Sequence, residues 1–126
     1  MIGFVMVGTN DLNKAINFYD ILFETIDLKR TVTNKKYAGY SSKEKPEDIE
    51  FYVTNPVNNE NANYGNGTQI SFVVNSKETV DKFYNLGIKL GGKDEGGPGI
   101  RPSGEYYCYL RDLDGNKICA FAKINN

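Results

Sequence analysis

The stretch Glu105–Ala122, EYYCYLRDLDGNKICAFA, decides the fold. Its first part, Tyr106–Leu110, is aromatic and apolar, which favours a half-buried strand. Asp112–Asn116, DLDGN, is typical of a tight turn, because the glycine after aspartate tolerates the positive φ that such turns need. Lys117–Ala122 then predicts a second strand, so we expect a β-hairpin here.

Length and composition predict one ordinary globular domain over residues 1–126, large enough to bury a core. The net charge is −1 with interspersed signs, so there is no basic stripe for nucleic acid. The apolar runs are too short to span a membrane, and the first residues lack the basic segment and cleavage site of a signal peptide. We therefore expect a cytoplasmic protein with no nucleic-acid or membrane partner.

Histidine is absent, and only two cysteines occur, Cys108 and Cys119. The lack of histidine excludes Ser-His-Asp and Cys-His nucleophilic sites, HExxH zinc sites and other histidine-based metal centres. The two thiols could face each other across the hairpin, depending on its register. A native disulfide is not expected, because reducing compartments disfavour it.

The first half of the chain is predicted to contain a strand, a helix and three further strands. Gly3–Val7 is mostly apolar, which favours a strand buried on both faces. Thr9-Asn10-Asp11 offers N-cap side chains for a helix over Leu12–Phe23, where apolar residues recur every three or four positions. The three strands expected next are Lys29–Thr33, Tyr37–Ser41 and Ile49–Thr54.

The second half is predicted to start the same series again. Thr68–Asn75 is expected to be a strand, and Ser76 to cap a helix that ends at Gly87. Lys89–Gly92 is then expected to be extended. A glycine-rich loop over Gly91–Glu105 leads to the hairpin.

The two halves match at an offset of about 65 residues, which is too long for a solenoid unit. Phe18-Tyr19 falls on Phe83-Tyr84, and the first strand falls on Gln69–Phe72. We interpret this as a duplicated βαβββ module and predict an α+β fold. The modules are expected over residues 1–57 and 68–126, with a connection at 58–67. One face of each sheet is covered by its helix, and the other lines a cup.

Several motifs, in this order along the chain, resemble the vicinal-oxygen-chelate superfamily, which includes glyoxalase I, bleomycin resistance proteins and extradiol dioxygenases. They are Asn10-Asp11-Leu12, Phe18-Tyr19, Gly65-Asn66-Gly67, GGPGIRP at Gly96–Pro102 and RDLDGNKI at Arg111–Ile118. The resemblance covers the whole chain and implies the fold more strongly than any activity. It also implies a homodimer.

Enzymes of this superfamily hold a divalent metal with one ligand from each of four strands. The resemblance places Phe4, Glu50, Gln69 and Cys119 at these positions. Phe4 cannot ligate, and one carboxylate with one thiol suits neither a hard divalent ion nor tetrahedral zinc. We expect no cofactor, although a three-ligand site of Glu50, Gln69 and Cys119 is an alternative.

Three of these candidate residues each allow two interpretations. Glu50 is either an acid/base or cation anchor, or a partner in an ordinary hydrogen bond to Gln69. Cys119 is either a reactive thiol activated by Arg101 or Lys117, or a buried inert cysteine, which is the commoner outcome. Arg101 either binds a substrate carboxylate from a lid-like loop or is an ordinary surface arginine.

The nine tyrosines and seven phenylalanines suggest an aromatic cup for a planar or cationic ligand. The residues expected to line it are Phe4, Glu50, Tyr52, Gln69, Arg101, Tyr107 and Cys119. The sequence therefore predicts a metal-free small-molecule-binding protein of the bleomycin-resistance kind. The alternative is a glyoxalase-like lyase or isomerase that uses Glu50, with or without a divalent metal, so whether the protein is an enzyme stays open.

Overall fold

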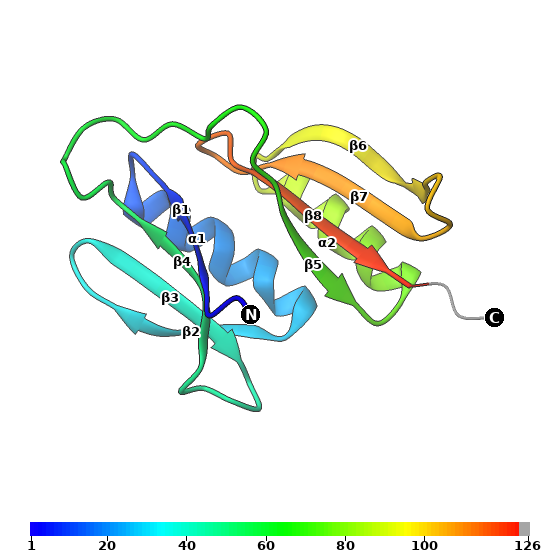
Figure 1. Cartoon of the computed structure of the whole chain (residues 1–126), viewed down its shortest axis with the longest axis horizontal. Helices are drawn as coiled ribbons and strands as arrows, with labels where there is room; N and C mark the ends of the chain where they lie inside the picture. The colour runs from blue at the N-terminus through cyan, green and yellow to red at the C-terminus, as the bar shows by residue number, and fades with distance from the viewer. Residues whose placement is uncertain (124–126) are drawn as a thin grey trace.

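The computed structural model of the chain describes residues 1–123, which form two four-stranded sheets with one long helix against each (Figure 1). The first module contains β1 (Val5–Gly8), α1 (Leu12–Leu22), the short 3₁₀ helix η1 (Phe23–Ile26), β2 (Leu28–Thr33), β3 (Tyr37–Ser42) and β4 (Ile49–Thr54). The second contains β5 (Ile70–Val74), α2 (Lys77–Lys89), β6 (Lys93–Ile100), β7 (Tyr106–Arg111) and β8 (Lys117–Ala122).

The two sheets have the same topology. Their strand orders are β1-β4-β3-β2 and β5-β8-β7-β6. In each sheet the first and last strands of the module pair in parallel, and the other neighbours are antiparallel. The predicted α+β fold of two βαβββ modules is confirmed, and the strands form two separate four-stranded sheets in place of one cup-shaped sheet.

Both long helices begin at the residues that the sequence offers as caps. The Asp11 carboxylate accepts a hydrogen bond from the Lys14 backbone N–H at 3.1 Å, and the Ser76 hydroxyl accepts one from the Thr79 N–H at 3.1 Å. Each bond satisfies one of the backbone donors that a helix N-terminus leaves without an intrahelical partner. The caps therefore fix where each helix leaves its preceding strand.

The core is a cluster of aromatic rings shared by the two modules. Phe23 of η1 and Phe51 of β4 both contact Phe72 of β5, with ring centroids 5.3 and 5.8 Å apart. Tyr19 and Tyr40 extend the cluster in the first module through edge and tilted contacts. Aromatic pairs of this geometry add to the free energy gained from burial alone, so the two helices and two sheets enclose one core.

The turn of the final hairpin fastens the second module to the first. The buried Asp112 carboxylate accepts the Tyr19 hydroxyl of α1 at 2.5 Å. Asn116 donates its side-chain amide to the Gly8 carbonyl at 2.9 Å, and Asp114 accepts the Asn10 N–H at 2.9 Å. We call these contacts the turn latch. They give the DLDGN motif a tertiary role in addition to its turn geometry.

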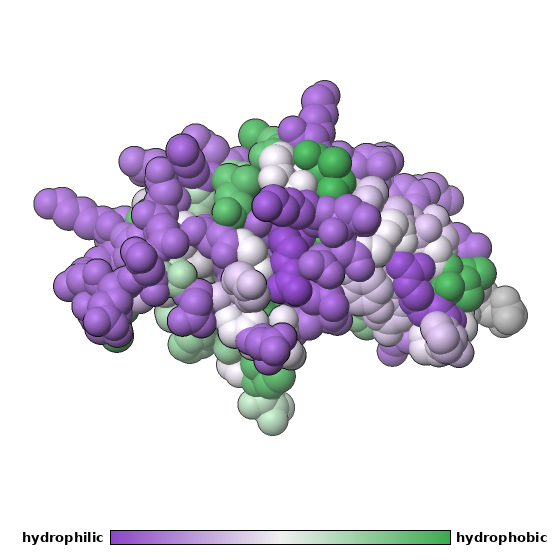
Figure 2. All heavy atoms as spheres, turned by 90° about the horizontal axis from the view of Figure 1, so that it is seen from above, coloured by the Kyte–Doolittle hydropathy of each residue, from purple (hydrophilic) through white to green (hydrophobic). Residues whose placement is uncertain are grey.

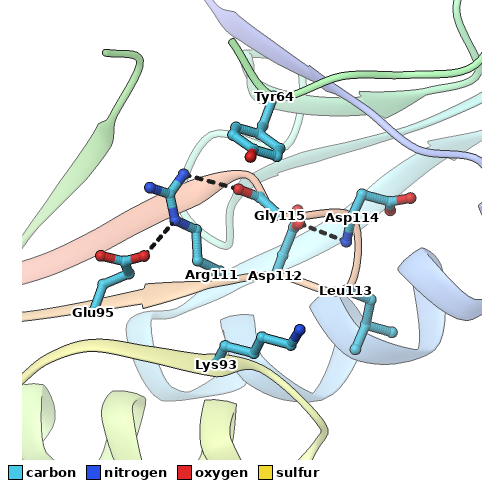
Figure 3. Close-up of a pocket in the computed structure, with 8 residues that line it drawn as sticks. All are labelled: Tyr64, Lys93, Glu95, Arg111, Asp112, Leu113, Asp114 and Gly115. Carbon is cyan, nitrogen blue, oxygen red and sulfur yellow. Dashed lines mark hydrogen bonds and ion pairs between the residues drawn. The ribbon is translucent and has the colours of Figure 1, made fainter. Parts of the chain in front are cut away.

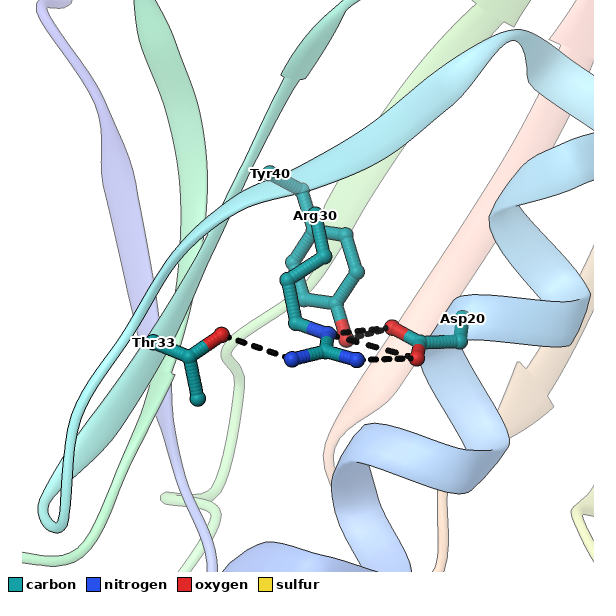
Figure 4. A network of polar contacts seen from close by, with 4 residues as sticks. All are labelled: Asp20, Arg30, Thr33 and Tyr40. Carbon is teal, nitrogen blue, oxygen red and sulfur yellow. Dashed lines mark hydrogen bonds and ion pairs between the residues drawn. The ribbon is translucent and has the colours of Figure 1, made fainter.

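A second polar network joins α1 to the far edge of its sheet (Figure 4). The Arg30 guanidinium of β2 donates to both carboxylate oxygens of Asp20, at distances between 2.9 and 3.2 Å, and also to the Thr33 hydroxyl at 2.7 Å. The Tyr40 hydroxyl donates to the same carboxylate at 2.8 Å. Burial and this hydrogen bond raise the pKa of Tyr40, so its hydroxyl stays protonated and the network stays closed at neutral pH.

Gly115 has the positive φ that the hairpin turn was predicted to need, but Gly87 and the glycines of Gly91–Glu105 were wrongly interpreted from sequence. Gly87 lies inside α2, which continues to Lys89. A Cβ at this position would come within 2.7 Å of the Leu110 side chain, so the glycine makes room for Leu110. The segment expected to be extended at Lys89–Gly92 is therefore the helix end and a turn. The expected loop over Gly91–Glu105 contains the eight-residue strand β6, whose pairing with β7 shifts register at Gly96.

The first strand is also more exposed than expected. Phe4 and Met6 are 55% and 49% exposed, whereas Val7 is buried. Only the face toward α1 is covered, so burial on both faces is wrong for this strand. Figure 2 views the molecule from the end that carries the β4–β5 connection, where hydrophobic areas are small and separated by hydrophilic side chains. Within the described residues, no helix is both long and apolar enough to cross a membrane.

Candidate functional site

The predicted site residues lie on the sheet faces opposite the helices, which we call the open faces. Side chains of a strand alternate between faces, and Phe51, Leu110 and Ile118 belong to the core. Their strand neighbours therefore project from the open faces, and in Figure 1 both helices lie on the same side of the sheets. The structure divides the predicted residues into two groups, one on each sheet.

The open face of the first sheet carries Phe4, Glu50 and Tyr52. The rings of Phe4 and Tyr52 meet edge to face with centroids 5.0 Å apart. Glu50 is exposed and lies with Tyr52 in a shallow cavity of about 520 Å³, whose rim also includes Glu47 and Asp48. This group is acidic and open to solvent.

The open face of the second sheet carries a row of nearly parallel aromatic rings. Tyr107 stacks with Tyr109 of its own strand at 5.7 Å and an interplanar angle of 11°. On its neighbour β8, Phe121 stacks with Tyr107 at 4.9 Å and 12°. All three side chains are half-buried. Stacked in this way, they form a continuous aromatic stack on the open face, which we call the aromatic row.

Two cations lie against the end of the aromatic row. The Arg101 guanidinium carbon is 5.4 Å from the centre of the Tyr109 ring, and the Lys117 ammonium is 5.1 Å from it. Arg101 also donates to the Gly97 carbonyl at 2.6 Å. Cation–π contacts of this length hold a charged group in place while leaving its other donors available. This end of the face is therefore positively charged.

Cys119 is buried within the same surface. It pairs with Tyr109 on one side and with Ser71 on the other. Burial raises the pKa of its thiol, although the Ser71 hydroxyl and the cations of Lys117 and Arg101 act in the opposite direction. A protonated, buried thiol is a poor nucleophile, which favours the inert interpretation of Cys119.

The strand registers identify which residues of the two modules are equivalent. Val5 pairs with Phe51, and Ile70 pairs with Ile118. Aligning these pairs places Phe4 on Gln69 and Tyr52 on Cys119, whereas Glu50 aligns with Lys117. Tyr52 is therefore the first-module counterpart of Cys119, one pleat away from Glu50.

These residues do not fit a divalent metal. Phe4 has no donor atom, and the Gln69 amide donates a hydrogen bond to the Ser71 hydroxyl at 2.9 Å. No group of three or more His, Cys, Asp or Glu residues converges anywhere in the part of the chain that the structure describes. A hard cation needs several oxygen ligands, and zinc needs nitrogen or sulfur ligands in tetrahedral number. The sequence also allowed a hydrogen bond between Glu50 and Gln69. Within residues 1–123 no such bond is formed, and the Gln69 amide bonds to Ser71 instead.

A different cavity, of about 390 Å³, lies beside the turn latch (Figure 3). Arg111 dominates it, and this side chain already has three partners. It bonds to Glu95 at 2.9 Å and to the Gly115 carbonyl at 3.0 Å, and it lies 5.1 Å from the centre of the Tyr64 ring. We interpret this cavity as structural, because its main recognition group is satisfied by the protein itself.

Of the residues expected to line the cup, Arg101, Tyr107 and Cys119 gather on the open face of the second sheet. Ser71, Tyr109 and Phe121 lie beside them and were not in the expected set. Strand alternation could have identified Tyr109 and Phe121, because Tyr109 lies two positions after Tyr107 on β7 and Phe121 lies two positions after Cys119 on β8. The same alternation indicates Ser71, which lies two positions from Gln69 and bonds to it. Only its pairing with Cys119 depends on the β5–β8 register, which local sequence does not encode.

Paired βαβββ modules with helices on one side and open sheet faces on the other define a structural class, and comparison with known proteins identifies the family. The model of the Glyoxalase/Bleomycin resistance protein/Dioxygenase superfamily matches residues 1–120. The chain therefore belongs to this superfamily. A comparison with curated proteins gave no match.

Solved structures agree with this assignment. A glyoxalase/bleomycin resistance protein from Albidiferax ferrireducens T118 is 41% identical, covers 98% of this chain and 99% of its own, and has a TM-score of 0.89. The hypothetical protein SA1046 from S. aureus is 24% identical over 98% and 95% of the chains, with a TM-score of 0.76. A lactoylglutathione lyase from Agrobacterium tumefaciens is 19% identical over 97% and 92%, with a TM-score of 0.70. The last two show likeness of fold alone.

Proposed function

We propose that this protein binds a small planar molecule on the open face of its second sheet, without a metal. The observation that carries the proposal is the aromatic row. Three half-buried rings lie nearly parallel on a face that no element of the described chain covers. Aromatic side chains favour planar ligands, which can meet them edge to face along the stack or stacked on the ring at its end.

The metal-free part of the proposal is supported by donor chemistry. Phe4, Tyr52, Gln69 and Cys119 are equivalent in pairs and include no carboxylate or imidazole. The alternative function, a glyoxalase-like lyase or isomerase acting through Glu50, has less support. Glu50 is exposed, and it projects from the other sheet, away from the aromatic row.

We further propose that the protein forms a homodimer through its open faces. Phe4, Met6 and Val73 are 55%, 49% and 65% exposed and lie on or beside β1 and β5, the edge strands. Exposed apolar side chains on a sheet face are a common feature of interfaces. A second copy would cover them and would also exclude water from the ligand.

A panel of neutral and charged aromatic compounds tests the binding function by thermal unfolding. A ligand at about 100 times its Kd stabilises the folded state by about 2.7 kcal/mol, which gives a clear rise in Tm. Tyr107→Leu should remove the rise for compounds that bind. Tyr106→Leu is the matched control, because Tyr106 is the next residue of β7 but faces α2, where it bonds to Asp81.

Two results would contradict the proposal. One is a panel in which no planar compound raises Tm, or in which both leucine variants weaken binding equally. The other is nickel or zinc near one ion per chain in elemental analysis of protein purified without chelator. Turnover of a hemithioacetal that is lost in Glu50→Gln would instead support the lyase alternative.

A further inference from the structure

We infer that the molecule bound by the aromatic row carries a carboxylate or a similar oxyanion, held between Arg101 and Lys117. This inference rests on the proposed function and adds the charge of the ligand to it. The first observation is that both cations lie within 5.4 Å of the same ring centre, that of Tyr109. Both cations therefore flank this ring, Arg101 from the end of β6 and Lys117 from the start of β8.

Neither cation is neutralised by the protein. Within residues 1–123, no carboxylate oxygen lies within 4.0 Å of a side-chain nitrogen of Arg101 or Lys117. The acid nearest to Arg101 along the chain, Glu105, accepts the Tyr107 hydroxyl at 3.3 Å, and the acid nearest to Lys117, Asp114, accepts the Asn10 N–H at 2.9 Å. Arg111, the next cation on this face, does form an ion pair, with Glu95 at 2.9 Å. The charge at Arg101 and Lys117 is therefore left for a ligand.

The glycines of β6 make room for the guanidinium. A Cβ at Gly99 would come within 2.9 Å of Arg101 Nη1, and one at Gly96 would come within 3.2 Å of Nη2. The Arg101 backbone is held as well, because its N–H donates to the Glu105 carbonyl at 3.0 Å and its carbonyl accepts the Gly104 N–H at 2.8 Å. A side chain folded back over glycines and fixed at both ends is preorganised, which lowers the entropy lost on binding.

The hydrogen-bond capacity of the two cations fits an oxyanion. Arg101 spends one N–H on Gly97, and its remaining donors form a planar fork that matches a carboxylate. Lys117 adds a second positive charge from the opposite strand of the hairpin. A ligand with a flat apolar body and one carboxylate would use the aromatic row and both cations together.

Three naphthalene probes of equal shape test the charge. They are 2-naphthoate, neutral 2-naphthamide and the cation 2-naphthylmethylammonium, titrated by calorimetry into the full-length protein. We expect 2-naphthoate to bind about tenfold or more tightly than the amide, which is the size of one charge-assisted hydrogen bond. Its affinity should fall as NaCl is raised, whereas that of the amide should not.

Variants separate the ligand's charge from its shape. Arg101→Gln and Lys117→Gln should each weaken 2-naphthoate about tenfold and leave 2-naphthamide unchanged. Lys14→Gln, which removes an exposed cation of α1, should change neither. Arg101→Lys keeps the charge and should retain part of the affinity, which distinguishes loss of charge from misfolding.

The inference is overturned if the amide or the cation binds as tightly as the acid, or if Arg101→Gln and Lys14→Gln behave alike. In those cases the binding function stands, because a planar compound still binds. If none of the three probes binds while other aromatic compounds do, the inference fails alone. If no planar compound of any charge binds, the proposed function fails with it.

Discussion

Cys108 and Cys119 lie on paired strands but project from opposite faces of the second sheet. Cys108 pairs with Ala120, and Cys119 pairs with Tyr109, so the two thiols cannot meet across the hairpin. Both are buried and free. Burial raises the pKa of Cys108 to about 12 and also raises that of Cys119. At neutral pH each is therefore a protonated thiol.

We predict that neither cysteine reacts readily in the native protein. Since only the thiolate attacks, a raised pKa keeps the reactive fraction small until the pH approaches that pKa. Ellman's reagent at pH 8 should label the native protein about a hundredfold or more slowly than the urea-unfolded chain. Single variants Cys108→Ser and Cys119→Ser assign the two rates. Native labelling of Cys119 at the unfolded rate would instead support a reactive thiol.

At the scale of elements, the turn latch supplies polar contacts between the two modules. Asp112 accepts four hydrogen bonds, from the backbone of Asp114 and Asn116, the Asn116 amide and the Tyr19 hydroxyl. Burial still raises the pKa of this carboxyl above its usual range. Loss of one donor would leave a buried carboxylate with less compensation, which is costly in a low-dielectric interior.

Tyr19→Phe should therefore destabilise the protein by about 2 kcal/mol, the range for a buried hydrogen bond to a charged group. Urea unfolding at pH 7 measures the change. Tyr84→Phe is the matched control, because it removes a similar bond to Asp94 at an exposed position. It should cost less than about 0.5 kcal/mol, as surface changes usually do. Equal costs for the two variants would show that the latch adds no stability of its own.

The sequence predicted best those elements whose own residues favour a single local structure. The strands Ile49–Thr54 and Lys117–Ala122 have the predicted bounds. In both, apolar residues recur at every second position and so point toward the core. Ser76 caps α2 as expected, since a hydroxyl at that point satisfies a helix donor. Tyr107, which is expected from the sequence to line the binding cup, lies in the aromatic row, and ligand binding there stays a prediction.

The errors arose where a residue serves a distant contact. Gly87 is typical of a helix end, but in the structure it makes room for Leu110. Gly96 and Gly99 favour a loop, but here they leave space for the Arg101 guanidinium within a strand. Glycine has the same local signature whether it provides a positive φ or an absent side chain. The Ser71–Cys119 pairing was unpredictable for a related reason, since it depends on strands far apart in sequence.

At the scale of the whole molecule, one core joins two similar modules. Phe72 of the second module contacts Phe23 and Phe51 of the first. Removing either module would expose these large rings to water, at about 1.5–3 kcal/mol for each side chain. The modules are therefore repeats in sequence and topology but one unit in packing, and both open faces are held on the same side.

The proposed homodimer is tested by a charge on the open face. Met6→Lys should weaken self-association about tenfold or more, because an ammonium group would be buried against an apolar surface. Ile21→Lys is the control, since Ile21 is 47% exposed on α1 and Met6 is 49% exposed on β1. Sedimentation velocity over a range of concentrations gives the oligomeric state. A wild-type protein that stays monomeric at high concentration, or equal effects of both variants, would contradict the proposal.

The turn latch also sets an order for folding during synthesis. The Gly8 carbonyl and the Tyr19 hydroxyl belong to the part of the chain that is made first, yet their partners Asn116 and Asp112 are made near its end. A nascent chain on the ribosome can form its first sheet and helix early. These polar groups must then stay hydrated until the last hairpin has emerged. The surface of the first half that carries them therefore remains exposed to water until translation is almost complete.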